Sequence, residues 1–575
     1  MKQVKWALAV LMVITLVFVT ACSSNNGTDS STSTPTNNST APTTTPGNTD
    51  APDAPTAPAE PIDPIGKYET PVKMTMAVQR TAQEFVSGET DEDNRWIKEY
   101  LNALNIDVDV AWAMPGGEYF ERLGVTVATG DLPDVMAVDK VTLVQLVESD
   151  MIQDLTEVYE QYASPLLKSI IDLDGGGYAW KQASFDGRLM AAPERSANLA
   201  GKMIHIRKDW LDNLGLKPPT SIDELLEISR AFTYDDPDKN GQNDTLGLAT
   251  AKDIVSWNLD LSAFINGYGG YPKIWLKDDA GKLVYGSIQP EVRAGLLKLQ
   301  ELYKDGQIDR EFAVKDMNAV NADITAGKFG LAFGGLSTPI SPFQNVKKLE
   351  DKLDVISVPL VSITGQPAKP EGSVTVNTFY VVRKGYEHPE ALIKLQNLFV
   401  DIWYGEQAER YEEMITGVID EKTHNYFQYA PIKATNQGKN AFIHNRIVDA
   451  LDDKLPVSDL NTEEKNYYDL ITAYDAGTGD AAGWAYKRVF GPGGSLAVLK
   501  DYLEEDLYQV NEFYGLPTET MVTNWSTLQD MENELFPRIV MGESIESFDT
   551  FVKDWNNLGG VKITDEVNAW YQSNK

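Results

Sequence analysis

The first hydrophobic feature of the chain is a short apolar stretch that follows two lysines. Lys2 and Lys5 precede Trp6–Val19, which carries no charge. This stretch is shorter than the roughly 20 apolar residues that cross a bilayer, and its length is typical of a signal peptide. It ends at Thr20-Ala21-Cys22, so we predict that residues 1–21 are a signal peptide removed before Cys22.

The hydrophobic positions then almost disappear for forty residues. Residues 23–63 contain no lysine, arginine or aromatic residue, and Ile62 is their only large aliphatic side chain. Such a segment cannot bury enough apolar surface to offset its chain entropy. We therefore predict that residues 22–66 form a flexible, disordered linker.

Regular hydrophobic periodicity begins near Lys67. Residues 72–78, 106–110 and 135–138 alternate or cluster as buried strands do, and a helical pattern lies around residues 96–101. Strands that alternate with helices predict an α/β fold with parallel βαβ units. Ligands of such sheets bind beyond the carboxyl ends of the strands.

Turn and cap signals predict further helices. A helix that begins at Leu211 is expected to end at Gly215, which accepts a left-handed C-cap. Ser221, three residues before Glu224, predicts a capping box that opens the next helix. For Arg207, Asp209 and Trp210, between a strand and a helix, we favour a structural role over ligand contact.

Composition narrows the class of partner. The 575 residues contain 85 acids and 50 bases, a formal net charge of −35. This charge argues against nucleic acid, which requires a basic surface, and against binding to anionic lipid headgroups. Cys22 is the only cysteine, so an intrachain disulfide is excluded.

Several motifs, in this order and spacing, resemble those of family-1 extracellular solute-binding proteins, in particular their large lipoprotein branch. They are Thr129-Gly130-Asp131-Leu132-Pro133-Asp134, Ile206–Leu216, Gly327-Lys328-Phe329-Gly330, Phe490-Gly491-Pro492-Gly493-Gly494-Ser495 and Trp555-Asn556-Asn557-Leu558-Gly559-Gly560. The small residues before Cys22 likewise resemble the lipobox of bacterial lipoproteins. That likeness implies a lipidated (palmitoylated) Cys22 and an anchor on the outer face of the cell membrane, in a host we expect to be Gram-positive. The alternative is an ordinary signal peptide with an incidental cysteine.

The family resemblance implies a two-lobed, periplasmic-binding-protein-like fold of type II. We expect residues 67–194 and about 373–510 in lobe 1, and residues 195–372 and about 511–575 in lobe 2. The hinge segments would cross near Pro193–Ala200 and Val374–Phe379. The implied function is that of a monomeric, non-enzymatic receptor that binds an oligosaccharide between the lobes, closes on it and docks on the permease of an ABC importer.

Candidate ligand contacts come from loops at the expected mouth of the cleft. Registration on maltose-binding protein puts Trp257 where that protein has a ligand-contacting acid, although core packing of Trp257 is an equal alternative. The other loop candidates are Gln79, Arg80, Asp139, Lys140, Glu194 and Arg195. Trp525 is a further candidate, because the family often has an aromatic residue near the cleft in this late segment. Each of these can also be an ordinary exposed or packed residue. After Gly334-Gly335 the family commonly has tryptophans, whereas this chain has Leu336-Ser337.

A ten-residue stretch carries the pattern of a calcium loop. Asp236, Asp238, Asn240, Gln242 (through its carbonyl) and Asp244 offer oxygens at alternate positions, and Gly241 permits the sharp turn. The stretch resembles the calcium loop of alginate-binding members of the family. Thr245 stands where those members have a further acid, which weakens the expected sixth ligand. A structural Ca²⁺ is our expectation, and a solvated turn is the alternative.

Two other classes of function stay open at this point. A secreted glycosidase or polysaccharide lyase needs a suitable carboxylate pair, which 85 acids do not exclude. No HExxH, GxSxG or phosphate-loop motif occurs, and the four histidines are scattered. A surface adhesin is the third class, but no repeat of 20–50 residues is present.

Overall fold

The computed structural model describes residues 62–574, apart from 82–84, 87, 172–176, 195–200, 257, 373–375, 377, 406, 408–409, 420–421 and 436–437. The predicted signal peptide, Cys22 and almost all of the linker lie outside the described residues. So do most of the two predicted hinge crossings. In the described part of the chain, no helix is both long enough and apolar enough to cross a membrane.

A five-stranded mixed sheet takes its strands from two distant parts of the chain. Its order is β2 (Ile106–Pro115), β1 (Val72–Arg80), β3 (Val135–Val138), β14 (Thr378–Val382) and β6 (Ala192–Glu194). β1 is parallel to both β2 and β3, whereas β14 runs antiparallel to β3 and β6. The three strands predicted from hydrophobic alternation are therefore confirmed, and β14 completes the sheet from 240 residues further on.

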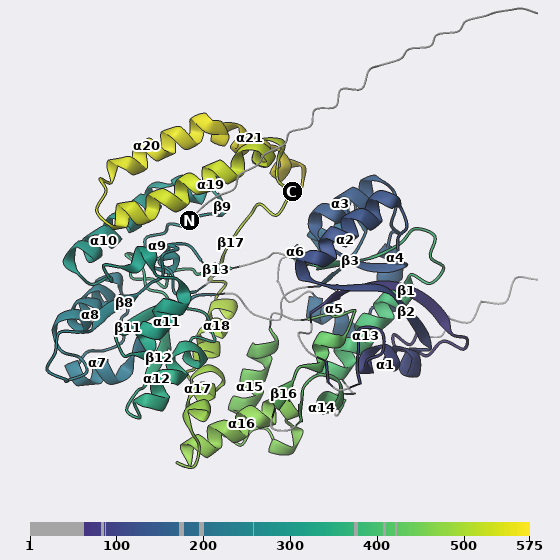
Figure 1. Ribbon diagram of the computed structural model, residues 1–575, viewed down its shortest axis with the longest axis horizontal. Coiled ribbons are helices and arrows are strands. Elements are labelled where there is room, and N and C mark those ends of the chain that lie inside the picture. Colours follow the sequence, from purple (N-terminus) through teal and green to yellow (C-terminus); the bar gives the residue numbers. More distant parts are fainter. Residues whose placement is uncertain are drawn as a thin grey trace, which may run out of the picture. The chain divides into compact units, whose positions relative to one another are not determined.

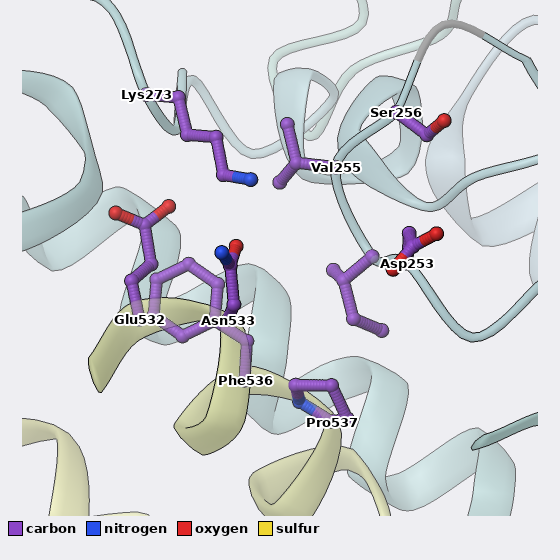
Figure 2. Close-up of a pocket in the computed structure, with 9 residues that line it drawn as sticks. Asp253, Val255, Ser256, Lys273, Glu532, Asn533, Phe536 and Pro537 are labelled. Carbon is purple, nitrogen blue, oxygen red and sulfur yellow. The ribbon is translucent and has the colours of Figure 1, made fainter. Parts of the chain in front are cut away.

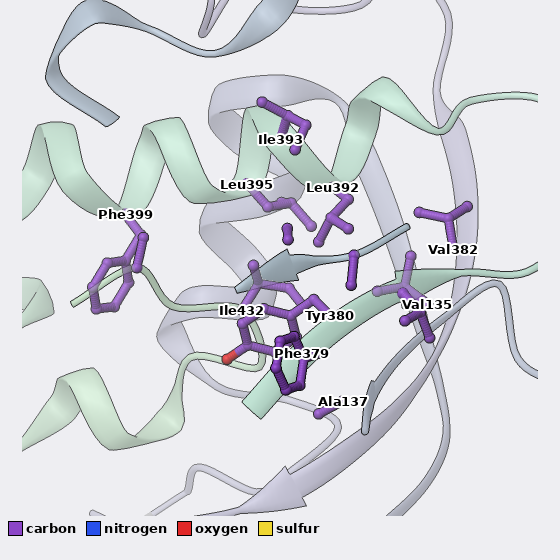
Figure 3. Packing of buried hydrophobic residues seen from close by; sticks show 14 of the residues in the cluster. Val135, Ala137, Phe379, Tyr380, Val382, Leu392, Ile393, Leu395, Phe399 and Ile432 are labelled. Carbon is purple, nitrogen blue, oxygen red and sulfur yellow. The ribbon is translucent and has the colours of Figure 1, made fainter. Parts of the chain in front are cut away.

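Helices pack against this first sheet and share its core. They are α1 (Arg95–Leu104), α2 (Gly116–Thr129), α3 (Lys140–Glu148), α4 (Thr156–Tyr162), α5 (Pro165–Ile171), α6 (Tyr178–Ala183), α13 (Glu390–Tyr404) and α14 (Tyr411–Met414). Figure 3 shows α13 directing Leu392, Leu395 and Phe399 toward the strands, beside Tyr380 of β14. Two hairpins lie in the chain segments that form this sheet. They are β4 (Ser184–Phe185) with β5 (Arg188–Leu189), and β15 (Gly417–Ile419) with β16 (Lys422–His424).

A second, four-stranded sheet has its own core. Its order is β12 (Val355–Val358), β7 (Met203–Arg207), β11 (Phe329–Gly334) and β8 (Leu246–Ala249). β7 is antiparallel to β11 and β12, and β8 is parallel to β11. The helices between these strands are α7 (Lys208–Leu214), α8 (Ile222–Tyr234), α9 (Ser262–Asn266), α10 (Pro290–Asp305), α11 (Met317–Thr325) and α12 (Gln344–Leu349). A hairpin of β9 (Trp275–Lys277) and β10 (Leu283–Tyr285) completes the region.

The last third of the chain is mostly helical. α19 (Glu519–Val540), α20 (Glu546–Trp555) and α21 (Val561–Ser573), the yellow helices of Figure 1, share a core with the second sheet. α15 (Lys439–Leu451), α16 (Thr462–Asp475), α17 (Ala481–Phe490) and α18 (Ser495–Glu504) precede them. The core of these four helices includes Met203 of β7, with Leu336 and Ile340 packed against it. The predicted division of the chain into lobe 1 and lobe 2 stays a prediction.

Two short parallel strands pair the segment after α18 with the segment that follows β12 of the second sheet. β13 (Glu371–Gly372) pairs with β17 (Gln509–Val510). β13 immediately precedes the predicted second hinge crossing.

Two local predictions are wrong in detail. The helix expected to begin at Leu211 begins at Lys208, because β7 ends at Arg207 and the chain turns directly into α7. Its end at Gly215, with φ 70°, is confirmed. Ser221 caps α8 by accepting a hydrogen bond from the Glu224 N–H, but the Glu224 carboxylate accepts from Thr220, one residue earlier than a capping box requires.

The structural role expected at the junction of β7 and α7 agrees with the packing there. The Arg207 guanidinium donates to Asp209 (Nε–Oδ1 3.1 Å) and to Glu350 (2.7 Å). It also lies 4.6 Å from the ring of the fully buried Trp210. Arg207, Asp209 and Trp210 are thus all engaged in contacts within the protein.

Candidate ligand-binding site

Five of the predicted ligand contacts lie at one edge of the first sheet. Gln79 and Arg80 end β1, Asp139 and Lys140 follow β3, and Glu194 ends β6. These three strands run in the same direction, and Thr378, which starts the antiparallel β14, pairs with Glu194. The five residues thus share the carboxyl edge, where α/β sheets bind ligands. Contact with a ligand stays a prediction for each of them.

Two of the five have structural partners in their loops. The Arg80 guanidinium forms an ion pair with Asp91 (Nε–Oδ2 2.7 Å), which is 8% exposed. The Asp139 carboxylate caps α3 by accepting a hydrogen bond from the Thr142 N–H (2.7 Å). Both side chains therefore stabilise the loops that shape the edge.

Lys140 has a different environment. Its ammonium donates to the carbonyl of Gln182 and lies 4.7 Å from the ring of Phe185 and 5.6 Å from that of Phe379. No carboxylate among the described residues forms an ion pair with it. Burial lowers the pKa of Lys140 to about 8.

A second lysine at this edge was missed from the sequence. Lys433 is 7% exposed, and burial lowers the pKa of its ammonium while the charge of Glu194 opposes that shift. The backbone N–H of Lys433 donates to the Tyr380 hydroxyl (3.2 Å), which in turn donates to the Glu194 carboxylate. Lys433 lies in an irregular segment after the β15–β16 hairpin, so no periodicity or cap pointed to it.

One of the remaining predicted contacts, Trp525, packs against the core of the second sheet. Trp525, on α19, stacks on Trp275 (6.3 Å between ring centroids, 20° between planes) and meets Tyr285 edge-on at 5.1 Å. It is half-buried among these rings. Trp257 and Arg195 lie outside the described residues.

The loop on either side of residue 257 is held by a buried ion pair. Lys202, just before β7, donates to Asp260 (2.6 Å), to the Ser262 hydroxyl (2.6 Å) and to the carbonyl of Ser256 (2.7 Å). The Asp260 side chain is completely buried and also accepts from the N–H groups of Ser256 and Ser262. This network fixes the loop at the start of β7, which is also where β8 and β11 end.

A pocket of about 250 Å³ lies beside this loop, between residues 253–256 and α19. Figure 2 shows the Lys273 ammonium, the Glu532 carboxyl and the Asn533 amide around it, with Asp253 and Ser256 on the other side. Glu532 is 1% exposed; its Oε2 accepts from the Tyr285 hydroxyl (3.1 Å), and its Oε1 has no partner among the described residues. Burial raises the pKa of Glu532 to about 7, although the charge of Lys273 opposes this.

The predicted calcium loop brings its oxygens around Asn240. Asp236 accepts from the N–H groups of Asn240 (3.0 Å) and Gly241 (3.1 Å). The Asn240 amide donates to Asp238 (2.8 Å) and Asp244 (3.2 Å), and its oxygen accepts from the Gln242 N–H (2.7 Å). Burial raises the pKa of Asp238, and the charges of Asp244 and Asp236 act in the same direction.

As arranged, this loop is not a complete metal site. In the described part of the chain, no three His, Cys, Asp or Glu side chains have their ligand atoms close enough together to hold an ion. In this arrangement the Asn240 NH₂ group lies against the Asp238 and Asp244 carboxylates. Thr245 is 5% exposed and donates to the carbonyl of Phe232 (2.8 Å), so its hydroxyl is turned away from the loop.

The carboxyl edge of a mixed sheet, lined by loops that carry polar side chains, is where a solute-binding protein holds its ligand. The model of the bacterial extracellular solute-binding protein family matches residues 87–403, more than half of the chain. The chain belongs to this family. The resemblance inferred from the motifs is confirmed.

Individual members of the family agree with this assignment. The chain is 26% identical over 493 residues to the polygalacturonan/rhamnogalacturonan-binding protein YtcQ of Bacillus subtilis (strain 168), covering 84% of this chain and 89% of that protein. It is 25% identical over 237 residues to the fructooligosaccharide ABC transporter substrate-binding protein FusA of Streptococcus pneumoniae serotype 4 (strain ATCC BAA-334 / TIGR4), covering 39% and 44%. These relatives are binding proteins and not enzymes, as predicted for this solute-binding protein.

A solved structure supports the predicted fold. The extracellular solute-binding protein of Bifidobacterium longum subsp. infantis matches with a TM-score of 0.57 and 18% identity, covering 88% of this chain and 98% of that one. The predicted two-lobed α/β architecture of the family is thereby confirmed.

Proposed function

We propose that this solute-binding protein is the lipid-anchored receptor of an ABC importer and delivers an oligosaccharide to its permease. The observation that supports this most strongly is the convergence of Gln79, Arg80, Asp139, Lys140 and Glu194 at one carboxyl edge. Membership of a family whose members here bind oligosaccharides gives the class of ligand. Closure of the two lobes on the sugar would present the loaded form to the permease.

The test is thermal melting of the mature chain against a panel of acidic and neutral oligosaccharides. A ligand that binds only the folded state stabilises it by about 2.7 kcal/mol at a hundredfold excess over Kd. We expect the melting temperature to rise with one sugar class, and the sugar to be recovered uncleaved. No rise with any sugar, or cleavage of one, would contradict the proposal.

We also propose that the loop of Asp236, Asp238, Asn240, Gln242 and Asp244 holds a structural Ca²⁺. Three carboxylates within one short turn repel one another, and a divalent cation would remove that repulsion. The backbone already turns as such a site requires, with Gly241 at φ 78°. Because Thr245 faces inward, we expect the affinity to be low, in the range that extracellular calcium concentrations satisfy.

Calcium binding is tested by melting in Ca²⁺ and in chelator. The wild-type chain should melt at a higher temperature in Ca²⁺, and Asp238→Asn should abolish that difference. Asp278→Asn is the matched control: Asp278 organises an ordinary turn by accepting from the N–H groups of Ala280 and Lys282, so the calcium effect should persist. An identical melting temperature with and without Ca²⁺ in the wild type would remove the proposal.

A further inference from the structure

The two named relatives leave the charge of the ligand open, since one is named for acidic pectic polysaccharides and the other for neutral fructooligosaccharides. The carboxyl edge of the first sheet bears on this question. Its charged groups are Arg80, Asp139, Lys140, Glu194 and Lys433. Their partners show which charges are already balanced inside the protein.

Two of the cations have acidic neighbours. Arg80 is paired with Asp91, and Lys433 is close enough to Glu194 for their charges to interact. The two edge acids are also engaged, Asp139 by the Thr142 N–H and Glu194 by the Tyr380 hydroxyl. Neither forms an ion pair with Lys140. Among the described residues, Lys140 is thus left with one carbonyl and two ring faces as its partners.

Such a cation is costly in this position. A half-buried ammonium that lacks a counter-ion has lost part of its hydration without gaining an opposite charge. Cation–π contacts recover only about 0.5–2 kcal/mol. The cost would grow when a bound sugar and a closing lobe exclude more water. Since the chain has 85 acids to 50 bases, the lack of an acid beside Lys140 in the described part of the chain is a local property of this edge.

The two lysines approach the edge from opposite faces of the sheet. Lys140 lies against Phe379 and Lys433 is bonded to Tyr380, and neighbouring residues of a strand face opposite ways. Lys140 and Lys433 are equal in number to the acids Asp139 and Glu194, but Glu194 interacts with Lys433 and Asp139 caps α3. Lys140 is therefore the cation of this group that has no acidic partner among the described residues. An anionic ligand would balance it.

We propose that Lys140 binds a carboxylate of the sugar, so that the ligand is an acidic oligosaccharide containing uronic acid. This inference rests on the proposed receptor function and specifies its substrate class. A carboxylate can take the free donor positions of the ammonium while Gln182 keeps the third. A charge-assisted hydrogen bond of this kind contributes on the order of 10- to 100-fold in affinity.

The experiment compares ligands that differ only in charge. Uronic acid oligomers of the galacturonate and glucuronate series and their methyl esters are titrated into the mature chain by calorimetry. The acid should bind at least 10-fold more tightly than its ester, and the preference should shrink as salt is added. A sulfated oligosaccharide is included so that a general preference for anions can be recognised.

Variants then assign the preference to Lys140. Lys140→Gln should bring the acid-to-ester affinity ratio close to one, and Lys140→Arg should keep most of it. Lys384→Gln is the control, because Lys384 is an exposed, ion-paired lysine at the opposite edge of the same sheet. Circular dichroism and melting of each variant verify that it is folded.

The possible outcomes separate the two proposals. Tighter binding of esters or other neutral sugars by the wild type would overturn the acidic ligand and keep the receptor. Binding of the sulfated sugar alone would overturn the carboxylate, and so would an acid preference that Lys140→Gln leaves intact. Binding of no oligosaccharide at all would overturn the receptor function itself.

Discussion

Glu532 lies on α19 with 1% of its surface exposed, and one of its two carboxyl oxygens has no partner among the described residues. Its other oxygen is bonded to Tyr285, whose ring stacks on Trp555 at 5.2 Å. A carboxylate in such surroundings is poorly solvated, which is why the proton is held until about pH 7. The residue therefore links the stability of the C-terminal helices to pH.

We expect Glu532→Gln to stabilise the protein in alkali. The pKa of Glu532 is higher in the folded than in the unfolded chain, so its contribution is complete below about pH 4.5 and is lost as the pH rises through about 7. At pH 8 the variant should gain on the order of 3 kcal/mol in the free energy of unfolding, and at pH 4.5 almost nothing. Urea denaturation at both pH values measures this.

The matched control is Glu534→Gln. Glu534 lies two residues along the same helix and is exposed. Its stability difference from the wild type should be small and nearly constant over the same pH range. An equal gain for Glu534→Gln would mean that net charge, and not burial, is responsible.

At the scale of elements, the second sheet depends on a glycine. Gly330 lies in β11 beneath Phe232 of α8 and Trp210 of α7, two rings that meet edge-on at 5.2 Å. A Cβ at this position would lie 2.2 Å from Phe232 and 2.5 Å from Trp210. This close approach gives a physical reason for the Gly327-Lys328-Phe329-Gly330 motif.

Gly330→Ala should lower the free energy of unfolding by about 3 kcal/mol, because the two rings must move off the sheet. Gly335→Ala, just beyond the end of the same strand, provides the comparison, since no atom lies within 4 Å of its added Cβ. That variant should change the free energy by less than about 0.5 kcal/mol. Equal effects in chemical denaturation would show that the rings can adjust.

The local pattern predicted some elements well and others not at all. β1 and β2 were predictable because alternation within a few residues determines which side chains face the core, and β3 because a short continuous apolar run indicates a strand buried on both faces. The place of β14 between β3 and β6 depends on pairing across 240 residues, which no local pattern encodes.

The same distinction applies to the candidate site. Lys140 was found because it follows a predicted strand, whereas Lys433 reaches the edge only through tertiary packing. Trp525 was chosen by analogy, and its ring packs among Trp275 and Tyr285. The partners of each side chain, and hence the unbalanced charge of Lys140, could not be read from one sequence.

At the scale of the whole molecule, the proposed anchor determines where the receptor works. We expect the wild-type chain, expressed in a Gram-positive host, to enter the detergent phase in a detergent partition assay. Cys22→Ala removes the thiol that would carry the lipid and should move the protein to the aqueous phase and the medium. Ser23→Ala, next to it, should partition as the wild type does. Wild-type protein in the aqueous phase would contradict the lipoprotein assignment.

The central place of β14 in the first sheet has a consequence for the time course of folding. β6 has no strand partner in this sheet except β14, and α13, which follows β14, supplies much of the first core. Since synthesis starts at the N-terminus, about 400 residues must be made before this core can close, whereas the strands of the second sheet all lie within residues 203–358. The segment made first is finished late, and this delay would keep the leading end of a secreted polypeptide unfolded while it is still being exported.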